Sequence, residues 1–217
     1  MNILTKTMQA VKDFDASIVA ARNEFEATKN QIFATYSNTI AAEKLGAARE
    51  ALTAFELKET VKTRDAVKAD FVEARNAVFE FVTKPVPDSF TATLAALQVK
   101  GDKISPFEAA SFLDKYKDNY MAYSATLKAL NDFGHVADVF VKTPDGLNDD
   151  ITHIEKRVLD WVNTRTSTGN TFGADYWTRL LTKDSGSPIE VLAKKIEDYL
   201  AGGFILDSRH EFVREVN

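Results

Sequence analysis

Cysteine is missing from this chain of 217 residues. Without a thiol, the chain has no disulfide, no thiolate nucleophile and no zinc site built from thiolates. A membrane-spanning helix needs about 18 consecutive apolar residues, and no apolar run approaches this length. The sequence therefore predicts no membrane-spanning segment. The first residues, MNILTKTMQAVKDFD, lack a basic segment followed by a long apolar core, so we expect no signal peptide.

Glycine and proline are scarce in the first part of the chain. Between Thr5 and Thr83 there is no proline, and Gly46 is the only glycine. Ala, Glu, Lys and Arg dominate this stretch, and all four are good helix formers. The two prolines of TKPVPDS (83–89) cannot continue a helix. We therefore predict an all-α fold with a long helical hairpin or coiled coil, a proline hinge and a compact, acidic multi-helix domain. These parts are predicted at residues 1–84, 85–90 and 91–217.

Apolar residues recur every seven positions in the first helical stretch, at Leu4, Val11, Ile18, Phe25 and Ile32. The register slips around Phe33–Ile40, and this apolar seam then resumes at Ala41, Leu45, Ala48, Leu52 and Phe55. Repeats of this kind pack helices side by side. The repeat mixes Phe with Ala where a parallel dimeric zipper prefers Ile, Val and Leu. This composition favours a hairpin over a continuous rod that pairs with other chains. Gly46 is the favoured turn, and the Ser37–Asn38 pair is a second candidate break.

Charge is unevenly distributed along the chain. Residues 1–84 carry twelve basic and twelve acidic residues, whereas residues 85–217 carry fifteen basic and twenty acidic residues. The whole net charge of −5 therefore lies in the second part. General binding to a phosphate backbone needs clustered Lys and Arg, so this distribution argues against nucleic acid as a partner.

Two capping boxes predict helix starts in the second part. SPFE (105–108) and SPIE (187–190) each place Ser three residues before Glu, with Pro at the first helical position. We expect the first of these helices to continue to Phe133, with Gly134 as its stop, and the second to end at Leu200.

Weaker signals complete the second part of the chain. In VADVFVKTPDG (136–146) a short strand competes with helix. Further helices are predicted from Ser89 to about Val99, from Asn148 or Asp149 to about Arg165, after the loop at 167–173 as far as TRLL (178–181), and from Ser208 onwards.

A row of tyrosines is the first candidate contact surface. Tyr116, Tyr120 and Tyr123 follow one another at helical spacing, in line with Leu113 and Leu127. Such a face can contact a partner helix or a small ligand, but aromatic rings also bury large apolar areas within a core. We favour packing within the chain for this row.

The second candidate contact surface is the loop sequence STGNTFGADYW, which ends in Tyr176 and Trp177. Exposed Tyr and Trp often anchor interfaces. For Trp177 we favour a place in the core over outside contact. The candidate interface residues are thus Tyr116, Tyr120, Tyr123, Tyr176 and Trp177.

No pattern in the sequence indicates chemistry. His135, His153 and His210 are scattered, and neither HExxH nor a comparable ligand spacing occurs. GxSxG, SxxK and glycine-rich phosphate loops are missing as well. We therefore expect no catalytic residues, no cofactor, no metal site and no small-molecule substrate.

These observations favour a non-enzymatic structural or assembly protein that acts through helical protein–protein contacts, with copies of itself among the possible partners. The Ala- and Phe-rich, cysteine-free composition tilts this prediction towards a bacteriophage virion or capsid-assembly component. Its location would then be the cytoplasm of the host cell or the virion. The alternative is an acidic helical adaptor or inhibitor that binds a host or regulatory protein.

Overall fold

The computed structural model describes residues 3–134, 139–166, 171–183 and 185–207. Over these residues the fold is all-α, as the sequence predicts, with a single short two-stranded sheet. The helices are α1 (Thr5–Thr35), α2 (Asn38–Val82), α3 (Ser89–Lys100), α4 (Pro106–Asp114), α5 (Tyr120–Asp132), α6 (Pro144–Arg165), α7 (Thr171–Leu181) and α8 (Pro188–Asp198). The strands are β1 (Val139–Val141) and β2 (Ile205–Asp207).

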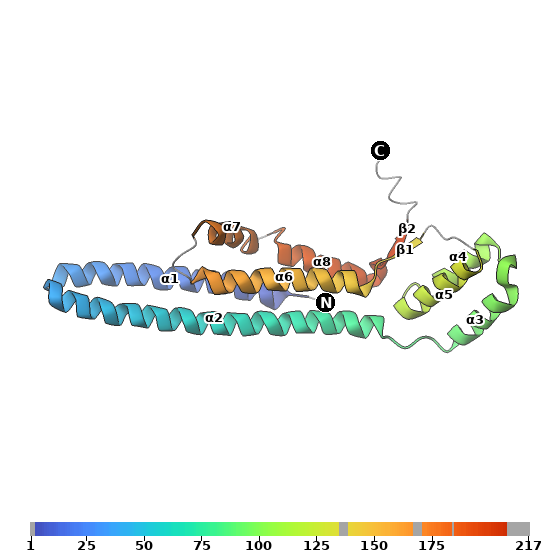
Figure 1. Ribbon diagram of the computed structural model, residues 1–217, viewed down its shortest axis with the longest axis horizontal. Helices are drawn as coiled ribbons and strands as arrows, with labels where there is room; N and C mark the ends of the chain where they lie inside the picture. Colours follow the sequence, from blue (N-terminus) through green and yellow to red (C-terminus); the bar gives the residue numbers. More distant parts are fainter. Residues whose placement is uncertain (1–2, 135–138, 167–170, 184, 208–217) are drawn as a thin grey trace, which may run out of the picture. The chain divides into compact units, whose positions relative to one another are not determined.

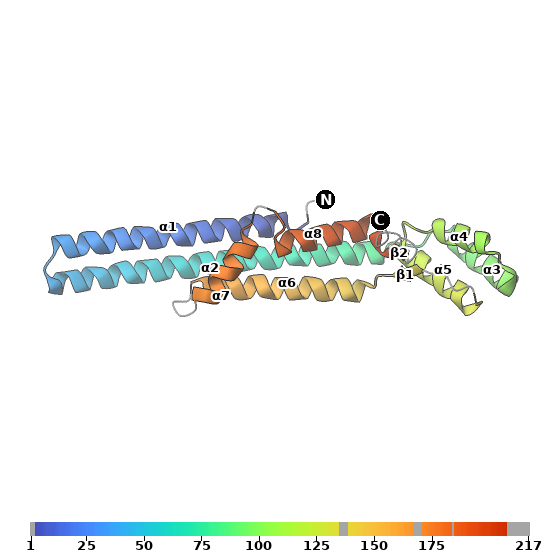
Figure 2. The same ribbon diagram turned by 90° about the horizontal axis from the view of Figure 1, so that it is seen from above.

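The long helices α1 and α2 form an antiparallel hairpin (Figures 1 and 2). The chain turns at Tyr36 and Ser37, so the break predicted at Ser37–Asn38 is confirmed and the continuous rod is excluded. The turn predicted at Gly46 is wrong, because Gly46 lies inside α2. A single glycine costs a helix only about 1 kcal/mol relative to alanine. Ser and Asn, by contrast, favour the first positions of a helix, and the carbonyl of Ser37 accepts the N–H of Ala41 at 2.8 Å.

The chain divides into two compact units. Unit 1 contains Met1–Glu73 and Ile151–Ala193, and unit 2 contains Ala74–Asp150 and Lys194–Asn217. The predicted proline hinge falls inside unit 2, where Pro85 and Pro87 follow the end of α2 in a non-helical stretch. The division into domains at residues 1–84 and 91–217 stays a prediction.

The core of unit 1 joins the hairpin to α6 and α7. Val11, Phe14 and Ile18 of α1 are almost completely buried, as is Trp161 of α6. The rings of Phe14 and Trp161 meet edge to face with their centroids 5.7 Å apart. The indole N–H of Trp161 donates to the hydroxyl of Thr178 in α7 at 2.9 Å. Since a buried indole N–H needs an acceptor, this bond fixes α7 against α6.

The core of unit 2 is an aromatic cluster around Phe204. Phe81, Tyr120, Tyr123 and Tyr199 all contact the Phe204 ring, with centroids between 5.4 and 6.0 Å away. Next to Phe204 the chain enters β2, which pairs with β1 in antiparallel register, Val141 opposite Ile205. Strand is therefore the outcome at residues 139–141, where the sequence left strand and helix open.

The helix predicted to run from Pro106 to Phe133 is wrong, because a turn separates α4 from α5. Asn119 ends this turn as the N-cap of α5: its Oδ1 accepts the N–H of Ala122 at 2.9 Å. Its Nδ2 donates to the carbonyl of Pro85 at 2.9 Å. Both halves of the buried amide are thus satisfied only if the helix is interrupted here.

The predicted helix starts and stops agree with the structure in most other places. The capping box at Ser105 and Glu108 is complete, and Gly134 adopts a positive φ of 82° just after α5. The hydroxyl of Ser187 caps α8 by accepting the N–H of Glu190 at 3.2 Å. The helix predicted from Asn148 or Asp149 starts earlier, at Pro144. The helix predicted from Ser208 lies outside the described residues.

Candidate protein-contact surface

The structure does not place the three predicted tyrosines on one helix. Tyr116 lies in the turn between α4 and α5, Tyr120 is the first residue of α5, and Tyr123 lies one turn further on. Tyr116 and Tyr123 are buried, and the Tyr116 hydroxyl lies 2.6 Å from that of Thr93. Tyr120 is half-buried against Phe204. These side chains pack within unit 2 and offer little surface to a partner.

Tyr176 and Trp177 lie on α7, not in a loop. The Tyr176 side chain is 60% exposed, and its ring meets that of Trp177 edge to face at 5.8 Å. Trp177 is half-buried, with the guanidinium of Arg157 at 5.4 Å from the ring centroid. Of the five candidate interface residues, Tyr176 is the most accessible.

A polar network fixes the end of α6 on the hairpin. The Nε of Arg165 donates to Asp15 at 2.7 Å, and the Nη2 of Arg22 donates to the Arg165 carbonyl at 3.1 Å. The Nε of Arg22 also donates to Glu56 of α2 at 2.7 Å. Arg165 and Asp15 are 150 positions apart, so no local spacing in the sequence could have indicated this network.

Towards the turn between α1 and α2, no other described helix of unit 1 lies beside this pair in either view (Figures 1 and 2). We call residues 17–58 the distal hairpin. Phe25, Leu45 and Leu52, which belong to the apolar seam, are only half-buried here. Phe33 is 56% exposed and Leu57 65% exposed. Two helices alone cannot enclose their apolar side chains, so the distal hairpin leaves apolar surface in water.

Between the two helices of the distal hairpin lies a groove of about 580 Å³. Glu24 is the only charged residue that lines it. The others are small or apolar, with alanines beside a few bulky side chains. The full lining is Ser17, Ala20, Ala21, Glu24, Phe25, Thr28, Ala48, Ala51, Leu52 and Phe55. A groove of this composition has the chemistry of a helix-packing surface.

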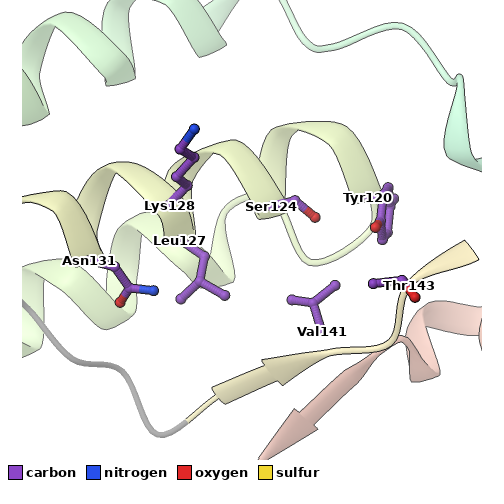
Figure 3. Close-up of a pocket in the computed structure, with 7 residues that line it drawn as sticks. All are labelled: Tyr120, Ser124, Leu127, Lys128, Asn131, Val141 and Thr143. Atoms are coloured by element: carbon purple, nitrogen blue, oxygen red, sulfur yellow. The ribbon is translucent and has the colours of Figure 1, made fainter.

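Unit 2 contains a smaller hollow of about 280 Å³ between α5 and β1 (Figure 3). Leu127 and Val141 lie opposite each other across it, while Lys128 points away from the strand. The hydroxyl oxygen of Ser124 is buried there without a hydrogen-bond partner. Tyr120 and Lys128 are the only titratable residues in the lining, so nothing in the hollow forms an acid–base pair.

A second hollow in unit 2, of about 220 Å³, lies at the N-terminus of α6. Asp150 and Lys195 form an ion pair there. Burial raises the pKa of the Tyr199 hydroxyl well above its ordinary value, so this group is a poor proton donor or acceptor at neutral pH. The carboxylate of Asp150 is thus paired with Lys195, and the Tyr199 hydroxyl stays neutral. This lining offers no acid–base pair either.

The described part of the chain contains neither a cluster of metal ligands nor a helix that could cross a membrane. Nowhere in it do three or more His, Asp or Glu side chains gather as a metal site would require. None of its helices combines the length and the hydropathy that crossing a bilayer demands. Comparison of the chain with protein-family models, with curated proteins and with solved structures finds no match.

Proposed function

We propose that this is a non-enzymatic structural or assembly protein that acts through helical protein–protein contacts, with the distal hairpin as its contact surface. The observation that carries this proposal is the apolar groove on a helix pair that no other described helix of unit 1 covers. Single folded chains rarely leave large contiguous apolar patches in water, and such patches mark interaction sites.

The contrast within the hairpin supports this assignment. Towards the open end of the hairpin, outside the distal hairpin, other helices cover the apolar side chains, so that Val11 and Phe14 are almost completely buried. In the distal hairpin the apolar seam continues, yet Phe25 and Leu52 are only half-buried and Phe55 is 37% exposed. The apolar side chains are thus buried within the chain near the open end of the hairpin. In the distal hairpin they stay accessible to another protein.

The narrower role of a bacteriophage virion or capsid-assembly component belongs to the same proposal. Its support is compositional: a cysteine-free helical chain, rich in Ala and Phe, that builds a long hairpin. A long hairpin with a small-residue groove suits repeated contacts between identical or similar subunits.

A second candidate function is that of an acidic adaptor or inhibitor. The observations that favour it are the net charge of residues 85–217, with fifteen basic against twenty acidic residues, and the exposed ring of Tyr176. Such a protein would bind its partner through charge and an aromatic anchor, leaving the groove unused.

Photo-crosslinking in cells that make the protein tests the proposal. A photoreactive amino acid in place of Ala51 lies in the groove, whereas one in place of Ala42 lies on the same helix at an exposed position outside it. We expect a defined protein adduct, with this chain or another, from position 51 and not from position 42. Adducts from position 176 alone would favour the adaptor. The absence of adducts at both position 51 and position 42 would contradict the proposed contact surface.

A further inference from the structure

We infer that the occupant of the groove on the distal hairpin is a second copy of this chain, so that two hairpins close into a four-helix bundle. This inference rests on the proposed function and names the partner of the same surface. Three observations carry it: the mixture of large and small side chains in the groove, the charge of the distal hairpin and the area that it can bury.

The groove is suited to packing against its own image. In a two-fold interface each copy presents the same patch, so bulky groups must meet spaces on an identical surface. Ala20, Ala48 and Ala51 leave space along the groove, whereas Phe25 and Phe55 supply bulk. Bulky side chains of one copy can then lie over alanines of the other, which is how facing helices interdigitate in a bundle.

The charge of the distal hairpin permits a second copy to approach. Five basic residues balance five acidic ones within residues 17–58, so the segment is neutral. These are Arg22, Lys29, Lys44, Arg49 and Lys58 against Glu24, Glu26, Glu43, Glu50 and Glu56. A neutral surface neither repels its own copy nor attracts a strongly charged partner. A partner selected by charge would instead meet residues 85–217, which carry the whole net charge of −5.

The area of the distal hairpin is sufficient for a modest dimer. Each helix contributes about 20 residues and is therefore about 30 Å long. Two helices side by side, each about 10 Å across, present on the order of 600 Å². Both copies together would bury roughly 1,200 Å², which lies at the lower end for specific interfaces. The dimer should therefore dissociate on dilution.

Sedimentation analysis of the purified full-length chain tests the inference. Over a roughly hundredfold range of concentration, we expect a reversible shift from monomer to dimer by mass action. Ala51→Glu places a charge from each copy in the apolar interface and should weaken the dimer at least tenfold, since a buried unpaired charge is costly. Ala42→Glu, the same change at an exposed position outside the groove, should leave dimerisation unchanged.

Because Ala51 and Ala42 are both exposed in the single chain, both variants should keep the helical circular dichroism of the parent chain. The absence of cysteine allows a second readout. A bismaleimide should join two copies of Ala51→Cys at dimer-forming concentrations and should not join copies of Ala42→Cys.

A chain that stays monomeric at every concentration would overturn the inference, and so would a dimer that both glutamate variants weaken equally. If the purified chain is monomeric while photo-crosslinking at position 51 captures a different protein, the second copy is excluded and the proposed contact surface stands. If position 51 captures nothing and the chain is monomeric, both proposals fail.

Discussion

Asp70 of α2 caps the N-terminus of α1 from 63 positions away. Its Oδ2 accepts the backbone N–H of Thr7 at 2.7 Å and the Thr7 hydroxyl at 2.8 Å, and both residues are buried. The residue that precedes α1 is Leu4, which has no side-chain acceptor and adopts a left-handed φ of 57°. A neighbouring helix therefore supplies the acceptor and the negative charge that favour a helix N-terminus.

Removing this carboxylate should destabilise unit 1. Asp70→Ala leaves a buried N–H and a buried hydroxyl unpaired, so we expect a loss of about 2–3 kcal/mol in the free energy of unfolding. Thr7→Ala removes only the hydroxyl and should lose about 1 kcal/mol. Urea unfolding of both single variants and the double variant measures the coupling between them. Because both changes act on one interaction, the double variant should lose less than the sum. Strict additivity would show that the two residues stabilise the fold separately.

The ion pair between Arg165 and Asp15 should contribute more to stability than the pair between Lys6 and Glu73. The side chains of Arg165 and Asp15 are only 14% and 21% exposed, whereas those of Lys6 and Glu73 are 67% and 61% exposed. Asp15→Ala leaves a shielded guanidinium without its acceptor, and we expect a loss of about 1–3 kcal/mol.

Glu73→Ala is the matched control for this prediction, since water and salt screen an exposed pair and its removal should produce no measurable change. Both variants can be compared by chemical denaturation in the same buffer. Equal losses for the two variants would mean that burial does not determine the strength of these pairs.

Local signals in the sequence predicted most helix ends, and tertiary contacts decided the remainder. The capping box at Ser105 and the stop at Gly134 act within a few residues, so they could be identified from spacing alone. The interruption at Asn119 could not, because its amide is satisfied partly by the carbonyl of Pro85 on a distant segment. At Gly46 neither a positive φ nor a close approach requires glycine, and the cost of one glycine, about 1 kcal/mol, is too small to end the helix.

The candidate contact surface was also only partly predictable. The heptads correctly indicated that the first eighty residues pack as helices, and the sequence places Phe25 and Phe55 in that pattern. Which part of the hairpin stays open depends on where α6 ends. That position is fixed by Arg165 with Asp15 and Arg22, three residues brought together only by the fold.

Glu108 should titrate well below an ordinary glutamate. Its hydrogen bond to Lys100, together with bonds from the backbone and hydroxyl of Ser105, lowers the pKa of its carboxyl from 4.5 to about 2. The charged form is stabilised in the folded state. The contribution to stability is therefore complete above pH 4.5 and is lost as the pH falls from 4.5 towards 2. Carboxyl chemical shifts followed by NMR measure the midpoint directly.

Two variants control the Glu108 prediction. Lys100→Met removes the largest cause of the shift, so it should bring the midpoint part of the way back towards 4.5. Glu108→Gln does not titrate, and its stability should depend less on pH in the same acidic range. Since Lys100 and Glu108 are partly exposed, added salt should also raise the midpoint. A midpoint near 4.5 in the parent protein would contradict the geometry of the capping box.

Removing residues 1–84 tests whether the proline hinge separates two folding domains. The sequence predicts a separate helical domain at residues 91–217, after the hinge, yet unit 1 groups Met1–Glu73 with Ile151–Ala193. The deletion would expose Val158 and Trp161, which are almost completely buried in the full chain, and would remove the ring of Phe14. We therefore expect the fragment to aggregate or to lose its cooperative unfolding transition, with Trp fluorescence shifted to the red.

A matched fragment separates this outcome from a general intolerance of truncation. Residues 1–207 keep every described helix and both strands, so we expect both this chain and the full chain to unfold cooperatively. If residues 85–217 instead form a folded monomer with a sharp unfolding transition, other residues of the fragment must bury Trp161. The hinge is then a true domain boundary. The hairpin would then be an independent module, and its groove could be transferred to another protein without α6 and α7.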